Sequence, residues 1–334
     1  MRVLVATDAW RPQINGVVRS LENLAAEAPS FGVHISFLAP QDFQTVPLPG
    51  YGEIRLALAS PSAVKRAIAA ARPDSLHIAT EGPIGWITRH VCQKEGYPFT
   101  TSYHTRFPEY LAARLPVPLE WSYSALRRFH NSGAGIMVGS PTLKEKLEAR
   151  GFRNLTLWSP GVDAHVFRPC IERPLSFPKP VFLFVGRLSI EKNITAFLTL
   201  DLPGSMIVVG DGPLRTRLET EFPNVHFLGT RTGEALAEVY ASADVFVFPS
   251  LTDTFGIVLL EALACGLPVA AFPVMGPLDV IGRSQCGRLD MNLQHAALGA
   301  LNISREKCRA YASSFTWRES TRQFIENIKR AHEV

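Results

Sequence analysis

Two basic residues in the second half of the chain have the types and spacing of a phosphate-binding pair. Arg187 and Lys192 lie five residues apart, directly after a short apolar run with the composition of a strand. A guanidinium can donate two parallel hydrogen bonds to a phosphate, and an ammonium beside it adds a compact positive charge. Exposed basic side chains often contribute little, so a surface ion pair with Glu191 is an equal alternative for this pair taken alone.

The loop that follows a later strand-like run favours phosphate binding. It supplies Thr254, Phe255 and Gly256, and the apolar helical run behind it opens with Ile257 and Val258. The amide groups at the start of a helix have no partner within the helix and bind anions well. Glu261 interrupts the apolar run, where a buried carboxylate is costly without a partner. A ribose diol is one such partner, and a capped or ion-paired structural glutamate is the alternative.

The elements that position these residues follow an alternating pattern. Runs rich in Val, Ile and Phe alternate with amphipathic stretches, which is typical of parallel sheets covered by helices. The predicted strands span 3–6, 34–38, 76–78, 99–103 and 135–138 in the first half, and 181–185, 206–209, 225–227, 245–248 and 268–271 in the second. Loops after the second set begin at Gly186, Gly210, Ser250 and Phe272, and all four would line one sheet edge.

The sequence therefore predicts an α/β protein with two facing Rossmann-like domains and a cleft between them. The 334 residues are long enough for two ordinary domains. Four prolines and no apolar period mark residues 166–180. The predicted divisions are an N-terminal Rossmann-like domain over 1–168, a linker over 169–180, a second Rossmann-like domain over 181–314, and an amphipathic helix over 315–334.

Six motifs in this order resemble family 4 glycosyltransferases of the GT-B fold. They are Asn15-Gly16-Val17, Ser159-Pro160-Gly161-Val162-Asp163, Gly186-Arg187 with Lys192-Asn193, Val209-Gly210-Asp211-Gly212-Pro213, the run from Asp244 to Ala262, and Ala264-Cys265-Gly266-Leu267-Pro268-Val269. The resemblance covers essentially the whole chain. The Asn-Gly-Val start and the Thr-Asp-Thr-Phe-Gly loop resemble bacterial transferases that glycosylate diacylglycerol or phosphatidylinositol lipids, among them GDP-mannose-dependent α-mannosyltransferases. The resemblance implies retaining transfer of a hexose from a UDP- or GDP-sugar to a membrane lipid such as diacylglycerol. It also implies that 1–168 binds the acceptor, that 181–314 binds the nucleotide sugar, and that the helix over 315–334 crosses back to the N-terminal domain.

The resemblance also implies roles for individual residues. Arg187 and Lys192 match the pair that clamps the donor diphosphate, and Glu261 matches the acid that holds the ribose. Asp253 stands where the family usually has a glutamate that touches the donor sugar, which puts the identity of that sugar in doubt. His104 would face the donor sugar, so the expected catalytic residues are Arg187, Lys192, His104 and Asp253. The expected donor-binding residues are Gly16, Gly186, Gly210, Thr254, Phe255, Gly256, Ile257, Val258 and Glu261.

We expect the chemistry to need no metal ion and no cofactor, the nucleotide sugar being a co-substrate. The chain has no Asp-x-Asp motif and no cluster of His, Cys and Asp with metal-binding spacing. The two basic side chains and a helix N-terminus would neutralise the leaving diphosphate instead.

The segment 105–131 interleaves aromatic and basic residues and is the predicted contact with the lipid acceptor and an anionic bilayer. Its expected contact residues are Arg106, Arg114, Trp121, Arg127 and Arg128. The first 168 residues carry 18 basic against 13 acidic side chains, an excess that suits a membrane surface but is too small for nucleic acid. A pair of core helices with a solvated basic rim is the alternative.

The composition places the protein in the cytoplasm, peripheral on the inner face of the membrane. The five cysteines are scattered, which argues against a disulfide framework. The N-terminus enters a strand-like run without the features of a secretory signal. The apolar stretch 257–275 contains Glu261 and is broken at 266–268, so a buried helix and strand explain it better than a membrane span.

Three other functions stay open. A dinucleotide oxidoreductase would need a Gly-x-Gly-x-x-Gly motif, but Arg215 stands at the last position of the nearest match. A non-catalytic sugar-binding module would not need the phosphate pair. A transferase acting on a soluble sugar or polysaccharide is the strongest alternative, and binding to liposomes would separate it from the lipid-directed enzyme.

Overall fold

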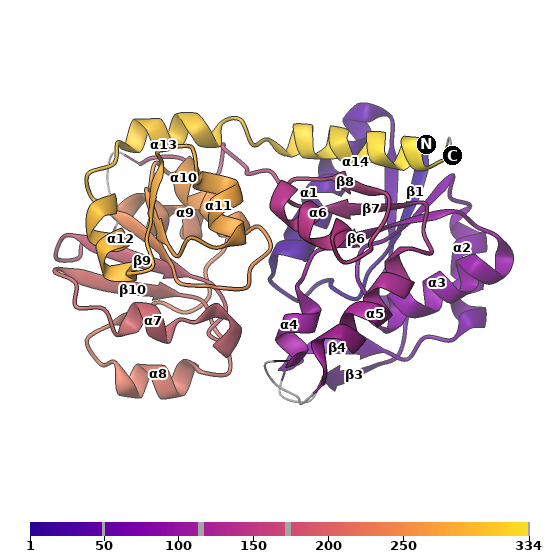
Figure 1. Ribbon diagram of the computed structural model, residues 1–334, viewed down its shortest axis with the longest axis horizontal. Coiled ribbons are helices and arrows are strands. Elements are labelled where there is room, and N and C mark those ends of the chain that lie inside the picture. Colours follow the sequence, from indigo (N-terminus) through magenta and orange to yellow (C-terminus); the bar gives the residue numbers. More distant parts are fainter. Residues whose placement is uncertain (49–50, 113–116, 171–174, 333–334) are drawn as a thin grey trace. The chain divides into compact units, whose positions relative to one another are not determined.

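The computed structural model describes residues 1–48, 51–112, 117–170 and 175–332. The chain divides into two compact units. Unit 1 comprises Met1–Pro160 together with Trp317–Val334, and unit 2 comprises Gly161–Thr316. Each unit is an α/β layered fold built on a parallel sheet, and the two sheets can be followed in Figure 1.

The sheet of unit 1 contains six parallel strands in the order β2-β1-β5-β6-β7-β8. They are β1 (Arg2–Ala6), β2 (His34–Leu38), β5 (Ser75–Ile78), β6 (Phe99–Tyr103), β7 (Gly135–Val138) and β8 (Leu155–Leu157). An antiparallel pair, β3 (Thr45–Leu48) and β4 (Tyr51–Ala57), interrupts the alternation. The chain thus adds strands to one side of β1 and then crosses to β5 on its other side, which creates a topological switch point between β1 and β5.

Helices cover both faces of this sheet. One hydrophobic core contains Leu21 from α1 and Phe324 from α14, and the other contains Val64 from α2, Ile84 from α3 and Phe129 from α5. The helices of the unit are α1 (Gly16–Glu27), α2 (Pro61–Ala71), α3 (Pro83–Glu95), α4 (Phe107–Ala112), α5 (Leu119–His130), α6 (Pro141–Glu148) and α14 (Trp317–His332), with short 3-10 turns at Ala28–Phe31 and Pro40–Asp42. The last helix of the chain therefore packs in the first unit (Figure 1).

The sheet of unit 2 is also six-stranded and parallel, in the order β11-β10-β9-β12-β13-β14. Its strands are β9 (Val181–Val185), β10 (Ser205–Val209), β11 (His226–Phe227), β12 (Val245–Phe248), β13 (Val269–Ala271) and β14 (Gly287–Leu289). Numbered within the unit, this is the 3-2-1-4-5-6 order of dinucleotide-binding Rossmann folds. Its switch point lies between β9 and β12.

The helices of unit 2 also pack on both faces of their sheet. Leu260 of α10 and Tyr240 of α9 lie in one core, while Phe197 of α7 and Ala297 of α12 lie in the other. The bounds are α7 (Thr195–Leu198), α8 (Arg215–Glu221), α9 (Gly233–Ser242), α10 (Ile257–Ala264), α11 (Met275–Ile281), α12 (Leu293–Ala300) and α13 (Arg305–Ala312), with a 3-10 turn at Ile190–Lys192.

The boundary between the units differs from the predicted one. Val162 and Phe167 lie in the core of unit 2, and the Val162 amide donates to the carbonyl of Phe315 at 2.9 Å. The guanidinium of Arg309 donates to the carbonyls of Ala164 and Phe167 at 2.9 and 2.7 Å. Residues in the stretch 161–168, which was predicted to end the N-terminal domain, therefore pack in unit 2, and the first unit ends at Pro160. Residues 171–174 of the predicted linker lie outside the described residues.

Candidate functional site

The loops after β9 and β12 meet at the switch point of unit 2. Lys192 ends the 3-10 turn after β9, and its Nζ lies 2.5 Å from Oδ1 of Asp253 in the loop after β12. The side-chain amide of Asn193 donates to the carbonyl of Pro249 at 3.0 Å, and the Thr252 hydroxyl donates to the carbonyl of Glu191 at 3.2 Å. Two of the predicted catalytic side chains are therefore in contact, on loops that are fastened to each other.

Glycines let the neighbouring loops approach closely. Gly210 has a φ of +138°, and a Cβ atom there would lie 1.9 Å from the carbonyl oxygen of Gly186. The amide of Gly186 donates to Val209 and that of Leu188 to Asp211, at 3.0 and 2.9 Å. The close fit between these two loops thus requires glycine at position 210. A larger residue would push the loop that carries Arg187. A contact of Gly186 or Gly210 with the donor stays a prediction.

The predicted helix start at the end of the β12 loop is present. Gly256 has a φ of +87° and precedes α10, which begins at Ile257 and contains Val258 in its first turn. A glycine at this position has no side chain to cap the helix, so the amides at the helix start keep the polarity that attracts anions. Thr254 and Gly256 are half-buried beside it.

Phe255 differs from its neighbours in this loop. Its side chain is buried in the core of unit 2, so any contact with a donor would have to come from its backbone. Its carbonyl oxygen is covered by α11, since a Cβ atom on Gly276 would approach it to 2.9 Å. The buried ring of Phe255 therefore holds the loop against the core of unit 2.

Glu261 is buried in α10, with 1% of its surface exposed. Its Oε2 accepts a hydrogen bond from the hydroxyl of Tyr240 at 3.2 Å, and the same hydroxyl lies 3.4 Å from the carbonyl of Val258. Tyr240 is wholly buried on α9 and orients the predicted ribose-binding carboxylate. Its role could not be predicted from the sequence, because a tyrosine in an apolar helical run looks like an ordinary core residue.

At the carboxyl end of β6, His104 packs edge-on against Trp158, 5.4 Å between ring centres. Burial, and then the nearby His130, lower the pKa of His104 to about 4. His77 on β5 was not predicted; it bridges the hydroxyls of Thr100 and Ser102 at 2.8 and 2.9 Å. Burial above all lowers its pKa to about 3. Both imidazoles are neutral at physiological pH.

These two histidines predict acid lability of unit 1. In the unfolded chain both titrate near pH 6.5, so between about pH 6.5 and 4 the unfolded state binds more protons and stability falls as pH falls. Each contributes up to about 1.4 kcal/mol per pH unit. All five tryptophans lie in unit 1, so urea unfolding followed by tryptophan fluorescence at pH 7.5 and 5 reports on this unit. In His77→Asn the free energy of unfolding of unit 1 should depend less on pH. An unchanged pH dependence would contradict the assignment of the acid lability to His77.

The predicted lipid-contact residues divide into two groups. Trp121 is 73% exposed, and Arg128 is exposed seven residues further along α5, on the same helix face. Arg106 instead binds the carboxylate of Glu109 through Nε at 2.8 Å, and Arg127 donates to the carbonyl of Arg150 at 2.9 Å. The latter two arginines make contacts within unit 1, and their expected role at a lipid surface stays a prediction. Arg114 lies outside the described residues.

The N-terminal loop residue Gly16 is exposed and begins α1. Asn15 caps this helix, because its side-chain oxygen accepts from the amides of Val17 and Val18, both at 3.0 Å. The start of α1 is therefore already satisfied by a side chain. The predicted approach of Gly16 to a diphosphate stays a prediction.

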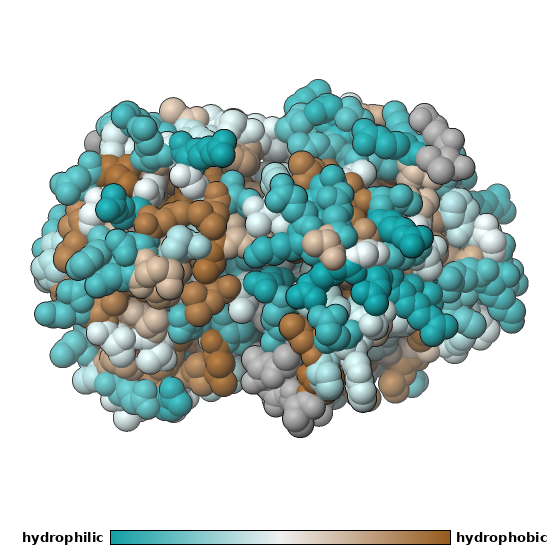
Figure 2. All heavy atoms as spheres, viewed as in Figure 1, coloured by the Kyte–Doolittle hydropathy of each residue, from teal (hydrophilic) through white to brown (hydrophobic). Residues whose placement is uncertain are grey.

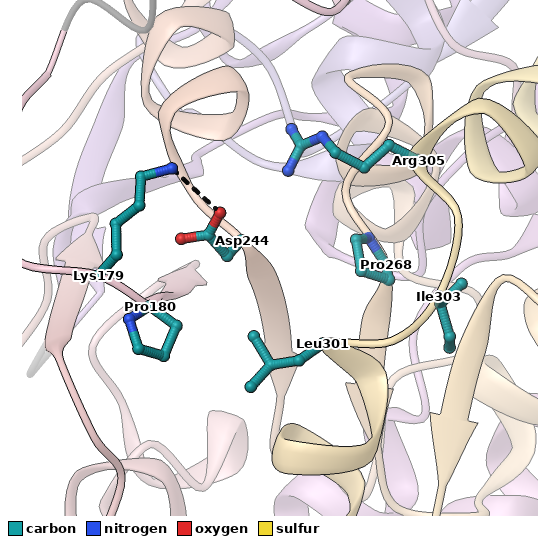
Figure 3. Close-up of a pocket in the computed structure, with 7 residues that line it drawn as sticks. All are labelled: Lys179, Pro180, Asp244, Pro268, Leu301, Ile303 and Arg305. Atoms are coloured by element: carbon teal, nitrogen blue, oxygen red, sulfur yellow. Dashed lines mark hydrogen bonds and ion pairs between the residues drawn. The ribbon is translucent and has the colours of Figure 1, made fainter.

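A surface cavity of about 370 Å³ lies at the opposite edge of the unit 2 sheet, where β9, β12 and β13 begin (Figure 3). Lys179 and Asp244 face each other across it at 3.4 Å, and Arg305 donates to the carbonyl of Ala243 at 2.8 Å. Ligands of open parallel sheets bind at the other edge. These charged side chains hold strand starts and helix ends, and the cavity is separate from the candidate site.

The described residues contain no group of three or more His, Cys, Asp or Glu side chains with the arrangement of a metal site. Within the same residues, no helix combines the length and the apolar character needed to cross a membrane.

Known proteins identify the class to which this fold and site belong. The model of "Glycosyltransferase Family 4" matches residues 14–166, and that of "Glycosyl transferases group 1" matches residues 179–298. A solved sucrose-phosphate synthase from Thermosynechococcus elongatus superposes with a TM-score of 0.79 at 20% identity, covering 99% of both chains. The two Rossmann-like halves are those of a GT-B glycosyltransferase.

Curated relatives place the chain within that class. A GDP-mannose-dependent α-mannosyltransferase of Mycobacterium tuberculosis is 30% identical over 315 residues, covering 86% of this chain and 83% of the relative. A GDP-mannose-dependent α-(1-6)-phosphatidylinositol dimannoside mannosyltransferase of the same species is 24% identical over 367 residues, covering 98% and 96%. The chain belongs to the family 4 glycosyltransferases and uses a nucleotide sugar as donor, as the motifs predicted.

Proposed function

We propose that this enzyme transfers a hexose, with retention of configuration and without a metal ion, from a nucleotide sugar to a hydroxyl of a membrane lipid. The observation that carries the proposal is the contact of Lys192 with Asp253 at the switch point, beside the start of α10. GDP-mannose is the donor to test first, because the mycobacterial relatives are named for it.

The chemistry assigned to these residues is electrostatic. Negative charge develops on the diphosphate as the sugar leaves, and Arg187, Lys192 and the first amides of α10 would stabilise it. Lys192 is held in place by Asp253, and an ammonium group has three donors with which to bind a phosphate. Among the described residues, Oδ2 of Asp253 has no hydrogen-bond partner, so it can accept a bond from a hydroxyl of the donor sugar.

The remaining groups bind the nucleotide and the acceptor. Glu261, oriented by Tyr240, would bind the ribose. The neutral ring of His104 would lie against the sugar as a hydrogen-bonding partner without competing for a proton. The acceptor hydroxyl would attack from the face of the leaving group, and its proton would pass to the departing phosphate oxygen.

Transfer to lipid is the direct test of the proposal. The protein is incubated with radiolabelled GDP-mannose or UDP-glucose and a bacterial membrane lipid extract, and the products are separated into organic and aqueous phases. Label in the organic phase, with the anomeric configuration of the donor retained, is expected. Label that appears only in water-soluble glycosides would favour a transferase of soluble sugars.

Activity should persist in an excess of EDTA. The reason is that the positive charge opposite the diphosphate comes from Arg187, Lys192 and a helix start, which no chelator removes. Initial rates with and without EDTA should agree to within about twofold, a difference too small for the loss of a group that stabilises the transition state. Restoration of a lost rate by added magnesium or manganese would overturn this part of the mechanism.

The exposed face of α5 should bind anionic bilayers weakly and reversibly. On the face of unit 1 displayed in Figure 2, hydrophilic residues predominate. A basic side chain near an anionic surface contributes about 1 kcal/mol, and an indole favours the headgroup region. Co-sedimentation with phosphatidylglycerol vesicles at low salt should fall in Trp121→Ala and in Arg128→Glu.

The control for this measurement is Met291→Ala, which removes an equally exposed apolar side chain, 75% accessible, from unit 2. If neither raised salt nor the two α5 variants changed vesicle binding, the exposed face of α5 would not be the part of the protein that contacts the bilayer.

A further inference from the structure

Unit 1 has a switch point of its own, between β1 and β5. On the β1 side, the carboxylate of Asp8 accepts hydrogen bonds from the amides of Ile84 and Gly85 at 2.8 and 3.3 Å and from the Thr80 hydroxyl at 2.9 Å. A side chain thus already occupies the start of α3, where an anion would otherwise bind. Recognition at this edge must come from the groups beside Asp8.

A cluster of polar side chains lies beside it, which we call the unit 1 polar cluster. Glu81 follows β5, Tyr103 ends β6, Glu109 lies on α4, and Tyr123 and His130 lie on α5. Oε1 of Glu81 lies 3.1 Å from Nε2 of His130, and the Tyr123 hydroxyl donates to Oε1 of Glu109 at 2.8 Å. Burial first, and then Tyr123, Glu81 and Glu109, raise the pKa of Tyr103, so its hydroxyl stays protonated.

The orientation of His130 fixes Glu81 as a hydrogen-bond acceptor. Nδ1 of His130 lies 2.8 Å from the Thr101 hydroxyl. A proton on Nδ1 alone would set the lone pair of Nε2 against the carboxylate of Glu81, so Nε2 carries a proton and donates it. Arg106 forms an ion pair with Glu109, whereas Glu81 is hydrogen-bonded to the His130 ring.

Two atoms of the cluster have unused hydrogen-bonding capacity. The hydroxyl of Tyr103, a residue only 1% exposed, and Oε2 of Glu109 are both buried and have no hydrogen-bond partner among the described residues. Buried polar atoms are nearly always paired, and one left without a protein partner indicates a ligand or a water molecule. A phenol offers a donor and a carboxylate offers an acceptor.

The ligand that suits this arrangement is a neutral group with several hydroxyls. Each hydroxyl can accept from Tyr103 and donate to Glu109 or Glu81. Two carboxylates disfavour a phosphate as the bound group. We propose that Tyr103, Glu81 and Glu109 bind the sugar or inositol headgroup of the acceptor lipid, so that the acceptor is a polyol-bearing lipid rather than diacylglycerol. This inference rests on the proposed function and narrows its acceptor.

The test compares lipids that differ in their headgroup. Phosphatidylcholine vesicles carry monoglucosyl-diacylglycerol, phosphatidylinositol or dioleoylglycerol, and transfer from labelled GDP-mannose or UDP-glucose is measured. We expect at least about tenfold faster transfer to one of the polyol lipids than to dioleoylglycerol, the effect of one lost hydrogen bond to a buried group. Preference for dioleoylglycerol would overturn the proposal. The two polyol lipids distinguish a glycosyl from an inositol headgroup.

Tyr103→Phe is the decisive variant, because the hydroxyl that it removes lies near that of Tyr123 but makes no hydrogen bond of normal geometry with the described residues. The KM for the polyol lipid should rise about tenfold, while the KM for the donor and the urea midpoint of unit 1 stay unchanged. Glu81→Gln should raise the same KM. Glu95→Gln is the control, because that carboxylate binds only Lys65, at 2.7 Å, near the other end of α3.

An unchanged acceptor KM in Tyr103→Phe would mean that the hydroxyl binds water alone, and the proposal would fall while the lipid transferase stood. If the wild-type protein glycosylated free glucose or inositol but none of the vesicles, the lipid part of the proposed function would fail. The polyol site would then be tested by comparing the KM of the wild type and of Tyr103→Phe for the free glucose or inositol.

Discussion

Replacing Lys192 with alanine should lower kcat by about 10²- to 10³-fold, the usual effect of removing one preorganised group that faces developing charge. Lys192 lies at the switch point on a loop fastened to its neighbour, so its ammonium group is held in place before the reaction begins. The measurement is kcat with GDP-mannose or UDP-glucose, whichever the wild-type enzyme uses.

The change also leaves Asp253 without its ionic partner, so folding has to be followed separately. Unit 2 contains no tryptophan, and its integrity is best monitored by far-ultraviolet circular dichroism. Lys307→Ala is the matched control, since Lys307 is an exposed lysine of the same unit. A folded Lys192→Ala protein with kcat within about threefold of the wild type would remove Lys192 from the mechanism, because that loss is too small for a group facing the leaving charge.

The regular part of the fold was predictable from the sequence. Central strands of parallel sheets are buried on both faces, and the apolar runs of β7, β9 and β12 have the predicted bounds. The predicted bounds of the edge strand β2 and of the more polar strand β6 also match the structure. The antiparallel pair β3 and β4 was missed, as were β8 and β14. β8 and β14 are short edge strands of three residues, which leave little periodic signal.

The linker shows why composition alone misplaces a boundary. Prolines placed the connection at 169–180 and so left 161–168 in the first domain. Val162 and Phe167 are instead core residues of unit 2, and their burial depends on distant partners such as Arg309 and Phe315. Such long-range packing has no local signature in the sequence. The boundary is therefore visible only once the fold is known.

The candidate site was predictable where the chemistry lies in short motifs. Lys192, Asp253 and Glu261 could be named because loops after parallel strands converge on one edge. Tyr240, Glu81 and His130 could not, since each acts through a contact between elements that are far apart in sequence. Arg106 differs from these residues, because its partner Glu109 lies only three positions along the chain, and its role at a lipid surface stays a prediction.

The second large effect concerns the helix that closes the chain. Phe324 of α14 is wholly buried in the core of unit 1, with its ring 5.0 Å from those of both Trp158 and His77. Truncation of a buried phenylalanine to alanine costs about 3–5 kcal/mol, from lost burial and from the cavity that remains. Phe324→Ala should therefore lower the free energy of unfolding of unit 1 by this amount.

Urea unfolding followed by tryptophan fluorescence measures this change in unit 1, which contains every tryptophan of the chain. Polar contacts hold α14 in register beside the ring: Trp158 donates to the Ser320 hydroxyl at 3.1 Å, and Asn327 donates to the carbonyl of Leu157 at 2.8 Å. Because these bonds remain in the variant, the helix should stay docked over a cavity rather than detach. Glu326→Ala, which removes only an exposed ion pair with Arg322, should change the stability by less than about 1 kcal/mol. A loss below about 1 kcal/mol in Phe324→Ala would show that α14 contributes little to the core of unit 1.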